Sequence, residues 1–326
     1  MEANVTQKKQ KNGFSSFLIK NNTYVMLIGL FIVCIIISPD FFNEANLVNI
    51  GRQSAGDIII ALGMLFVILT GGIDLSVGSV AALGSVMVAF ALTTHEMGMG
   101  MAILLPILFG LALGLATGVL IAYAKMAPFI ASLAMMTIAK GLAFMISNGQ
   151  PVITPENTIG VLGTHSVGPI PTLVILAAII IILFWIIEKY TAFGRIVIAI
   201  GSNETAVRLA GIPVRKYKMS VYAISGVCAA VAGIIAASRT AIGTPIIGSG
   251  WELNAIAACV IGGASLSGGE GSSVKAVVGV LVLALISNIM SLLAVPSYPQ
   301  DVIKGLIIIG SVLLQTFTSG KKSKGF

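Results

Sequence analysis

The sequence is short of charged side chains. Of its 326 residues only 10% are Asp, Glu, Lys or Arg, whereas 57% are hydrophobic. Soluble domains usually contain about 25% charged residues. A water-soluble protein of this size would have too few polar side chains to cover its surface. The composition therefore excludes a water-soluble fold and indicates a protein whose solvent is the lipid bilayer.

Cysteine and histidine are also scarce. The three cysteines, Cys34, Cys228 and Cys259, fall inside apolar runs, and the two histidines, His95 and His165, lie far apart. This arrangement has neither the spacing of metal ligands nor that of a disulfide framework. We therefore expect three buried, unreactive thiols, no metal site and no cofactor bound by this chain.

The apolar residues that are present fall into about ten runs. A spanning helix needs about 20 residues, with a range of about 17–25. The sequence therefore predicts an all-α, polytopic transmembrane helix bundle of about ten spans, with a transmembrane domain at 24–317 between tails at 1–23 and 318–326. The runs cover roughly 24–41, 52–70, 75–94, 101–124, 127–147, 171–188, 219–238, 252–266, 274–294 and 301–317.

The formal net charge of +7 could suggest a nucleic-acid partner. The basic residues, however, lie in short clusters between apolar runs, as positive loops beside spanning helices do, and we expect no nucleic-acid partner. Most of them belong to one predicted face of the membrane, which comprises 1–23, 125–126, 189–218 and 318–326. Cytoplasmic loops carry such an excess, so both termini and the loop at 189–218 are predicted to be cytoplasmic.

The stretch 266–270, Leu-Ser-Gly-Gly-Glu, is similar to the LSGGQ signature of ABC-type ATPase subunits. The sequence has no G-x-x-x-x-G-K-[ST] loop, so no lysine and hydroxyl are placed for phosphates and magnesium. The stretch also lies between two apolar runs. We conclude that this chain is not an ATPase and that any transport it performs needs an outside source of energy.

Two glycine-rich turns share the pattern G-G-x-x-L-S-x-G, one at 71–78 and one at 262–269. Each links an incoming run to an outgoing run on the same predicted face. A transporter built from related halves shows such weak symmetry, although two similar turns can also arise by chance. The turns supply six candidates for a translocation path or gate: Gly71, Gly72, Asp74, Ser76, Gly262 and Gly263.

The predicted cytoplasmic loop contains signals for a short helix at 203–211. Asn203 can cap its start, Glu204 suits the positive end of the helix dipole, and Glu204 and Arg208 are placed to pair four residues apart. Gly211 can adopt the left-handed conformation that ends a helix, and Pro213 prevents continuation. A helix this short needs a surface to dock against. Its apolar side chains, Ala206, Val207, Leu209 and Ala210, could face either its own bundle or a partner.

Few charges lie within the apolar runs. The candidates besides Asp74 are Asp57, Lys140, Asp301 and Lys304. A charge at the bilayer centre costs about 2.5–3.5 kcal/mol on insertion scales, so we expect these side chains to face the bundle interior or an interface. Asp301 and Lys304 are three residues apart and can pair locally. No chain of acidic groups suggests proton relay, so a path lined by Ser, Thr, Asn and Gly would suit an uncharged polar solute.

Three motifs together resemble those of a known family. The stretch from Val67 to Ser79, V-I-L-T-G-G-I-D-L-S-V-G-S, strongly resembles the signature of the ribose-type ABC importer permeases. The loop from Gly201 to Ile212 looks like their G-x-N-E-x-A-x-R-L-x-G-I stretch. The segment 250–258, G-W-E-L-N-A-I-A-A, is similar to their G-Y-E-L-D-A-I-A-A. Here Trp251 and Asn254 replace the usual Tyr and Asp, beside Glu252, which together with Asn254 is a further candidate for the path.

The resemblance implies a permease subunit in a bacterial cytoplasmic membrane. Such a subunit pairs with a second permease chain and works with a cytoplasmic ATPase, which binds ATP and Mg, and with an extracytoplasmic sugar-binding protein. The segment 203–211 then becomes the coupling helix, with Gly201, Asn203, Glu204, Ala206, Arg208, Leu209 and Gly211 as ATPase-coupling residues. The implied substrate is a monosaccharide, with ribose as the first expectation.

An alternative from another class is an ion-coupled secondary transporter for a small polar solute. The repeated glycine-rich breaks fit this hypothesis. The lack of paired carboxylates within the runs does not.

Overall fold

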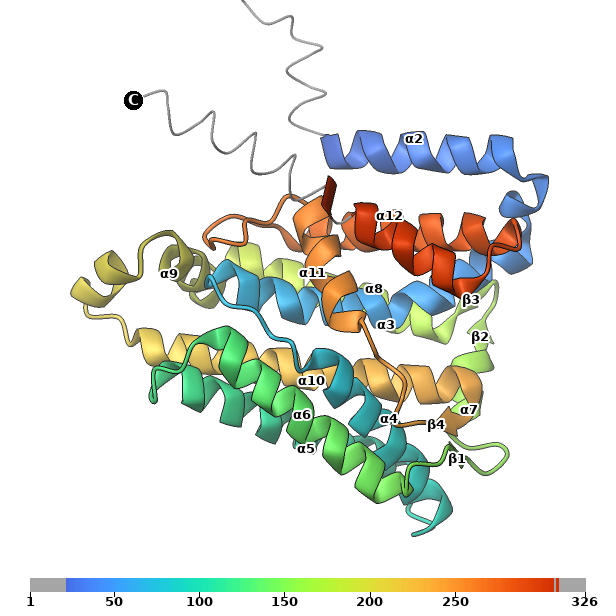
Figure 1. The fold of residues 1–326 in the computed structure, drawn as a ribbon, viewed down its shortest axis with the longest axis horizontal. Helices are drawn as coiled ribbons and strands as arrows, with labels where there is room; N and C mark the ends of the chain where they lie inside the picture. The colour runs from blue at the N-terminus through green and yellow to red at the C-terminus, as the bar shows by residue number, and fades with distance from the viewer. Residues whose placement is uncertain (1–21, 308, 311–326) are drawn as a thin grey trace, which may run out of the picture.

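The computed structural model describes residues 22–307 and 309–310, and the helices dominate it (Figure 1). The predicted tail at 318–326 and nearly all of that at 1–23 lie outside the described residues. The cytoplasmic placement of both termini therefore stays a prediction. The helices are α2 (Asn22–Ile37), the 3-10 helix η1 (Pro39–Phe42), α3 (Glu44–Leu69), α4 (Val77–Thr93), α5 (Met99–Ala122), α6 (Pro128–Ser147), α7 (Ile159–Thr164), α8 (Thr172–Tyr190), α9 (Ala192–Leu209), α10 (Val214–Thr240), α11 (Trp251–Ile261) and α12 (Ser273–Leu292).

Residues 297–307 and 309–310 are also helical. Two small antiparallel pairs of strands lie at one end of the bundle, beside α7 (Figure 1). They are β1 (Val152–Ile153) with β4 (Ile242–Gly243), and β2 (Ser166–Val167) with β3 (Ile170–Pro171).

The prediction of about ten spans is wrong in its count. Among the described residues six helices are long and apolar enough to cross a membrane, namely α3, α5, α6, α8, α10 and α12. Three further apolar helices are shorter, α2, α4 and α11, and the run at 301–317 lies partly outside the described residues. The apolar runs overstated the lengths of the helices, because an apolar run in the sequence does not show where a helix ends. The run at 252–266, for example, continues past the end of α11 into a glycine-rich turn.

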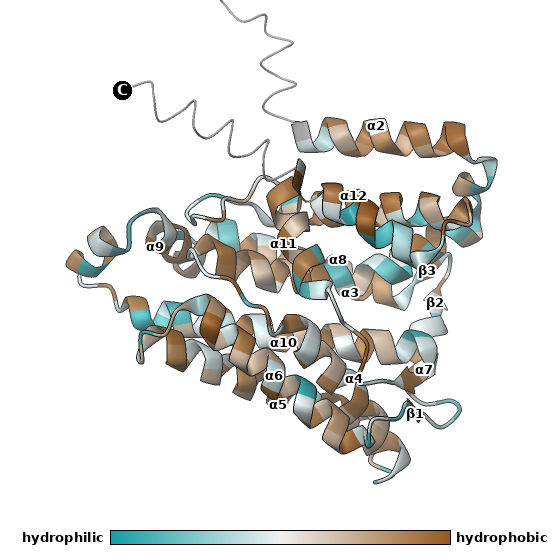
Figure 2. Ribbon diagram, in the orientation of Figure 1, coloured by the Kyte–Doolittle hydropathy of each residue, from teal (hydrophilic) through white to brown (hydrophobic). Residues whose placement is uncertain are grey.

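Two long helices form the centre of the bundle. In the 18-residue apolar stretches of α3 and α10, 83% and 72% of the residues are buried. In that of α8 only 17% are buried. The outer helices therefore turn apolar side chains away from the protein, as a lipid-facing surface requires. Figure 2 shows this hydrophobic colouring along α2, α5 and α6 at the edges of the molecule.

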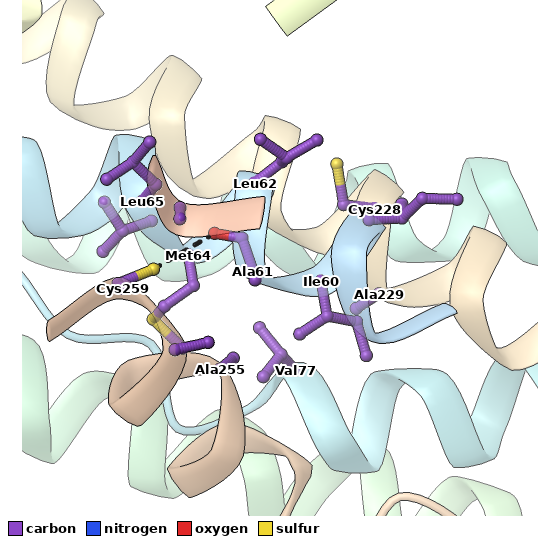
Figure 3. Close-up of a cluster of buried hydrophobic side chains, with 14 of the residues drawn as sticks. Ile60, Ala61, Leu62, Met64, Leu65, Val77, Cys228, Ala229, Ala255 and Cys259 are labelled. Carbon is purple, nitrogen blue, oxygen red and sulfur yellow. Dashed lines mark hydrogen bonds between the residues drawn. The ribbon is translucent and has the colours of Figure 1, made fainter. Parts of the chain in front are cut away.

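The core gathers on α3, where Ile60, Leu62 and Leu65 meet side chains of α4, α10 and α11 (Figure 3). Cys259 lies here and its Sγ is 3.3 Å from the carbonyl oxygen of Ala61, and Cys228 faces α3 from α10. All three cysteines are buried and free, which confirms the expectation of buried thiols.

Small residues let the helices approach closely. Gly110, Gly114 and Gly118 recur at every fourth position of α5, and a Cβ atom at any of them would collide with the backbone of α10. Close packing through small residues replaces the hydrophobic driving force that is missing in lipid. The high glycine content of the sequence, 37 residues, thus serves helix packing as well as turns.

Two predictions about charges in the spans have different outcomes. Lys304 and Asp301 do pair locally, with Nζ and Oδ1 3.7 Å apart. Lys140 does not face the interior, because it is exposed on α6.

Candidate coupling and gating site

The short helix at the end of α9 is a separate element. Asn203 has non-helical dihedrals (φ −160°, ψ 91°), so the chain turns sharply there before the helix resumes (Figure 1). The Asn203 side chain accepts a hydrogen bond from the backbone N–H of Ala206 at 3.0 Å. This is the predicted N-terminal cap, and it satisfies one of the donors that a helix start leaves free.

The far end also follows the prediction. Gly211 has φ +78°, a conformation that costs residues with a side chain about 1 kcal/mol or more, and its missing Cβ would meet nothing within 4 Å. The left-handed backbone alone therefore requires glycine here. Pro213 follows, and the next helix, α10, begins at Val214.

The predicted partner of Glu204 is wrong. Its Oε2 lies 2.6 Å from Nζ of Lys218, near the start of α10, not beside Arg208. Glu204 and Arg208 are four residues apart, but α10 starts next to the short helix and brings a second cation, Lys218, within reach of Glu204. The ion pair is partly exposed, so it contributes at most about 1 kcal/mol.

The side chains of the short helix divide into two groups. Val207 is buried and packs with Ile200 and Val214, which holds the helix to its own chain. Leu209 is 82% exposed, and Ala206, Arg208 and Ala210 are exposed beside it. The helix thus uses one apolar side chain internally and presents the others outward.

Gly201, just before the kink, packs α9 against the end of α3 and against the second glycine-rich turn. A Cβ atom at Gly201 would collide with the carbonyl oxygen of Leu69 and the backbone N of Gly269. These two groups are hydrogen-bonded to each other, N to O, at 3.0 Å. A Cβ atom at Gly268 would lie 2.8 Å from the backbone N of Gly71 and 2.9 Å from the Cα of Gly201. We call the contact of Gly71, Gly201, Gly268 and Gly269 with the end of α3 the glycine junction.

The two turns with the shared pattern therefore meet each other at Gly71 and Gly268, and Gly201, before the short helix, contacts the second turn and the end of α3. Gly72 packs beneath the hydroxyl of Tyr222, which donates a hydrogen bond to the Ile73 carbonyl at 3.4 Å. Gly262 and Gly263 end α11, and a Cβ at Gly262 would lie 2.5 Å from the carbonyl oxygen of Lys275 in α12.

Asp74 fastens the first turn to α10. It is 1% exposed, and its Oδ1 accepts hydrogen bonds from the backbone N–H and the hydroxyl of Ser76, at 3.0 and 2.6 Å. Its Oδ2 accepts one from the hydroxyl of Ser225 at 2.8 Å. Bonds to a charged group contribute about 1.5–3 kcal/mol each, so this carboxylate fixes the turn firmly.

Glu252 and Asn254 lie away from the junction. They occupy the opposite end of α11, where the Glu252 carboxylate rests against Gly78 at the start of α4. Asn254 lines a cavity between α3, α11 and α12. The candidates for the path thus fall into three groups: the glycines of the two turns, the Asp74 network, and the start of α11, which touches the end of the first turn at Gly78.

Sequence reasoning missed Ser225, Tyr222 and Lys218, all on α10. A signal existed for Ser225 and Tyr222, because a carboxylate placed between two helices needs donors and hydroxyls inside an apolar run are suited to provide them. Among the described residues, no group of three or more His, Cys, Asp or Glu side chains could hold a metal ion.

Comparison with known proteins identifies the family. Residues 46–312 match the family described as the permease component of the branched-chain amino acid transport system, and the chain belongs to this family of permeases. A ribose import permease protein of Haemophilus influenzae is 39% identical over 310 residues, covering 94% of this chain and 96% of that protein.

Two further relatives name the same kind of protein. A ribose import permease protein of Bacillus subtilis is 41% identical, over 88% of this chain and 90% of its own length. An L-arabinose ABC transporter permease protein of Azospirillum brasilense is 33% identical, over 98% of this chain and 94% of its own length. No solved structure matches. With six apolar helices of spanning length among its described residues, the chain is a multi-pass inner-membrane permease.

Proposed function

We propose that this chain is the permease subunit of an ATP-driven ABC importer for a monosaccharide, ribose or a similar pentose. The relatives named above are permeases for ribose and L-arabinose, and one is called an ABC transporter permease. The sequence has no phosphate-binding loop, so ATP and Mg would be bound by a separate ATPase. This chain would bind no cofactor.

The observation that carries the proposal is the exposed tip of the short helix, whose start at Gly201 packs backbone to backbone in the glycine junction. The ATPase would grip Leu209 and its exposed neighbours on the cytoplasmic side. Because Gly201 contacts the end of α3 and the second glycine-rich turn through backbone atoms, a push on 203–211 would move the end of α3 and the start of α12 together. Packed elements move as units, so such a displacement can switch access from one side of the membrane to the other.

The complete transporter would contain two copies of this chain and an extracytoplasmic sugar-binding protein. Most of the selection among sugars would then take place in the binding protein. Within this chain the glycine-rich turns, with Asp74, Ser76, Glu252 and Asn254, would form or border the gate.

The test is reconstitution of the permease with its ATPase and binding protein in proteoliposomes. Leu209→Ser should abolish ATP-driven ribose uptake and weaken copurification of the ATPase, because it removes the exposed apolar anchor without touching the core. Leu162→Ser, which changes a leucine of α7 at the other end of the bundle, is the matched control and should retain both. Full uptake in Leu209→Ser would contradict the coupling assignment.

The same vesicles test the secondary-transporter alternative. The permease alone, given an ion gradient and no ATPase, should carry no ribose. Ion-driven flux by the isolated chain would overturn the ABC assignment.

A further inference from the structure

Asp57 has an environment unlike that of its neighbours on α3. Every other residue from Ser54 to Leu69 is buried, yet Asp57 is exposed, and so is Gln53 one turn earlier on the same face. Asp57 lies close to the midpoint of α3, about 20 Å from either end at a rise of 1.5 Å per residue. A carboxylate at that depth is costly in lipid, so its exposure marks a hydrated space inside the membrane.

Two adjoining pockets provide that space. Both are lined by Gln53, Asp57 and Trp251, and we call them together the polar cavity. The first continues along α11 and α12 and towards the helix at 297–307, with Asn254, Ser287 and Lys304, and has a volume of about 220 Å³. One water molecule needs about 10–15 Å³ on this measure, so the pocket has room for several waters or for a small solute. The second continues to Arg239 near the end of α10.

The polar groups of the cavity make few hydrogen bonds or ion pairs with one another. Within the described ranges, Asp57 makes no ion pair within 4.0 Å. Arg239 and Lys304, which also line the cavity, attract its charge from farther away, and Lys304 pairs with Asp301 at 3.7 Å. The Gln53 amide makes one long bond, 3.4 Å, to Asn49. Asn254 makes no side-chain hydrogen bond to the rest of the described chain. A carboxylate with no cation in contact and two amides with spare hydrogen-bonding groups therefore face a space whose other wall includes an indole and the small side chains Ala255 and Ala258.

This combination suits a neutral solute with many hydroxyl groups. A carboxylate accepts from hydroxyls, and each amide both donates and accepts, which matches the mixed donors and acceptors of a sugar. An indole offers a flat apolar face with a polar edge, and a sugar ring has an apolar C–H face of similar extent. A few placed polar groups on otherwise apolar walls are the usual composition of a small-molecule site.

We propose that the polar cavity is a transit subsite for a polyhydroxylated solute, a monosaccharide, in which Asp57, Gln53 and Asn254 bind hydroxyls and Trp251 packs against the ring. This rests on the proposed function and adds a place where the permease itself holds the sugar. Trp251 and Asn254 stand where the resembling family usually has Tyr and Asp.

The first experiment measures ATP-driven ribose and arabinose uptake by the complete transporter. Asp57→Ala and Asn254→Ala should each lower uptake about tenfold, because each removes a hydrogen bond to the passing sugar. Lys140→Ala, which removes an exposed charge from a spanning helix outside the cavity, is the matched control and should retain uptake.

The second experiment is independent of how well the variants transport. Gln53→Cys should react with a charged, water-soluble thiol reagent, whereas Ile138→Cys, exposed on the apolar face of α6, should not. The native cysteines are buried and give little background. Ribose or arabinose, added with ATP and binding protein, should slow labelling of Gln53→Cys several-fold.

The outcomes separate the two proposals. If the unmodified transporter imports neither pentose, the proposed function fails and the subsite falls with it. If it imports a pentose while Asp57→Ala transports normally, or while Gln53→Cys is labelled at the same rate with and without sugar, only the subsite is overturned.

Discussion

The end and the middle of α3 are built in opposite ways. At its carboxyl end the Leu69 carbonyl meets Gly201 and Gly269 so closely that no side chain fits between the backbones. Halfway along, Asp57 lines the polar cavity and makes no ion pair within 4.0 Å among the described residues, with Arg239 and Lys304 attracting it from farther away. Because its backbones are in direct contact, the glycine junction is suited to move as one unit when one of its segments is displaced. The cavity is suited to hold something that must leave again, since its groups keep free hydrogen-bonding capacity.

The sharpest test of this contrast makes the same type of substitution, glycine to alanine, once in each region. Gly201→Ala places a methyl group on the Leu69 carbonyl and should break the Leu69–Gly269 hydrogen bond. Overpacking of this kind costs about 1–3 kcal/mol or more, and we expect loss of uptake together with a lower denaturation midpoint in detergent.

Gly56→Ala is the matched control from the cavity side of α3. Its added methyl would make only ordinary contacts, 3.8 Å from Ala232 and Ile235, so stability should change little. If both alanine variants had the same denaturation midpoint, the junction would not be the rigid region described here.

A second comparison uses serine hydroxyls. Ser225→Ala removes a buried donor from Asp74 and should lower the free energy of unfolding by about 1–3 kcal/mol. Ser287→Ala in the cavity removes a hydroxyl with no side-chain partner in the described chain, and should change it by less than about 0.5 kcal/mol. Denaturation in a detergent titration measures both. Equal losses would mean that the cavity wall is as tightly bonded as the Asp74 network.

Local features of this molecule could be predicted from the sequence, and contacts between distant segments could not. The cap at Asn203 and the left-handed Gly211 follow from neighbouring residues, and both were predicted. The junction unites segments near 71, 201 and 268, and only the packed bundle decides that these glycines touch. The pairing of Glu204 failed for the same reason, because Lys218 comes close only when α10 folds back beside the short helix. The span count failed because hydropathy runs extend across helix ends.

The smallest expected effects concern the two ion pairs, one in each region. Glu204 and Lys218 are 2.6 Å apart and partly exposed, and a double-mutant cycle with Glu204→Gln and Lys218→Met should give a coupling energy below about 1 kcal/mol. The Asp301–Lys304 pair, at 3.7 Å with Asp301 largely exposed, should give a value close to zero. A coupling energy of several kcal/mol for Glu204 and Lys218 would mean that charge holds the short helix in place. A value under 1 kcal/mol leaves the backbone contacts of Gly201 and the buried Val207 as the attachment through which a force on Leu209 would reach the proposed gate.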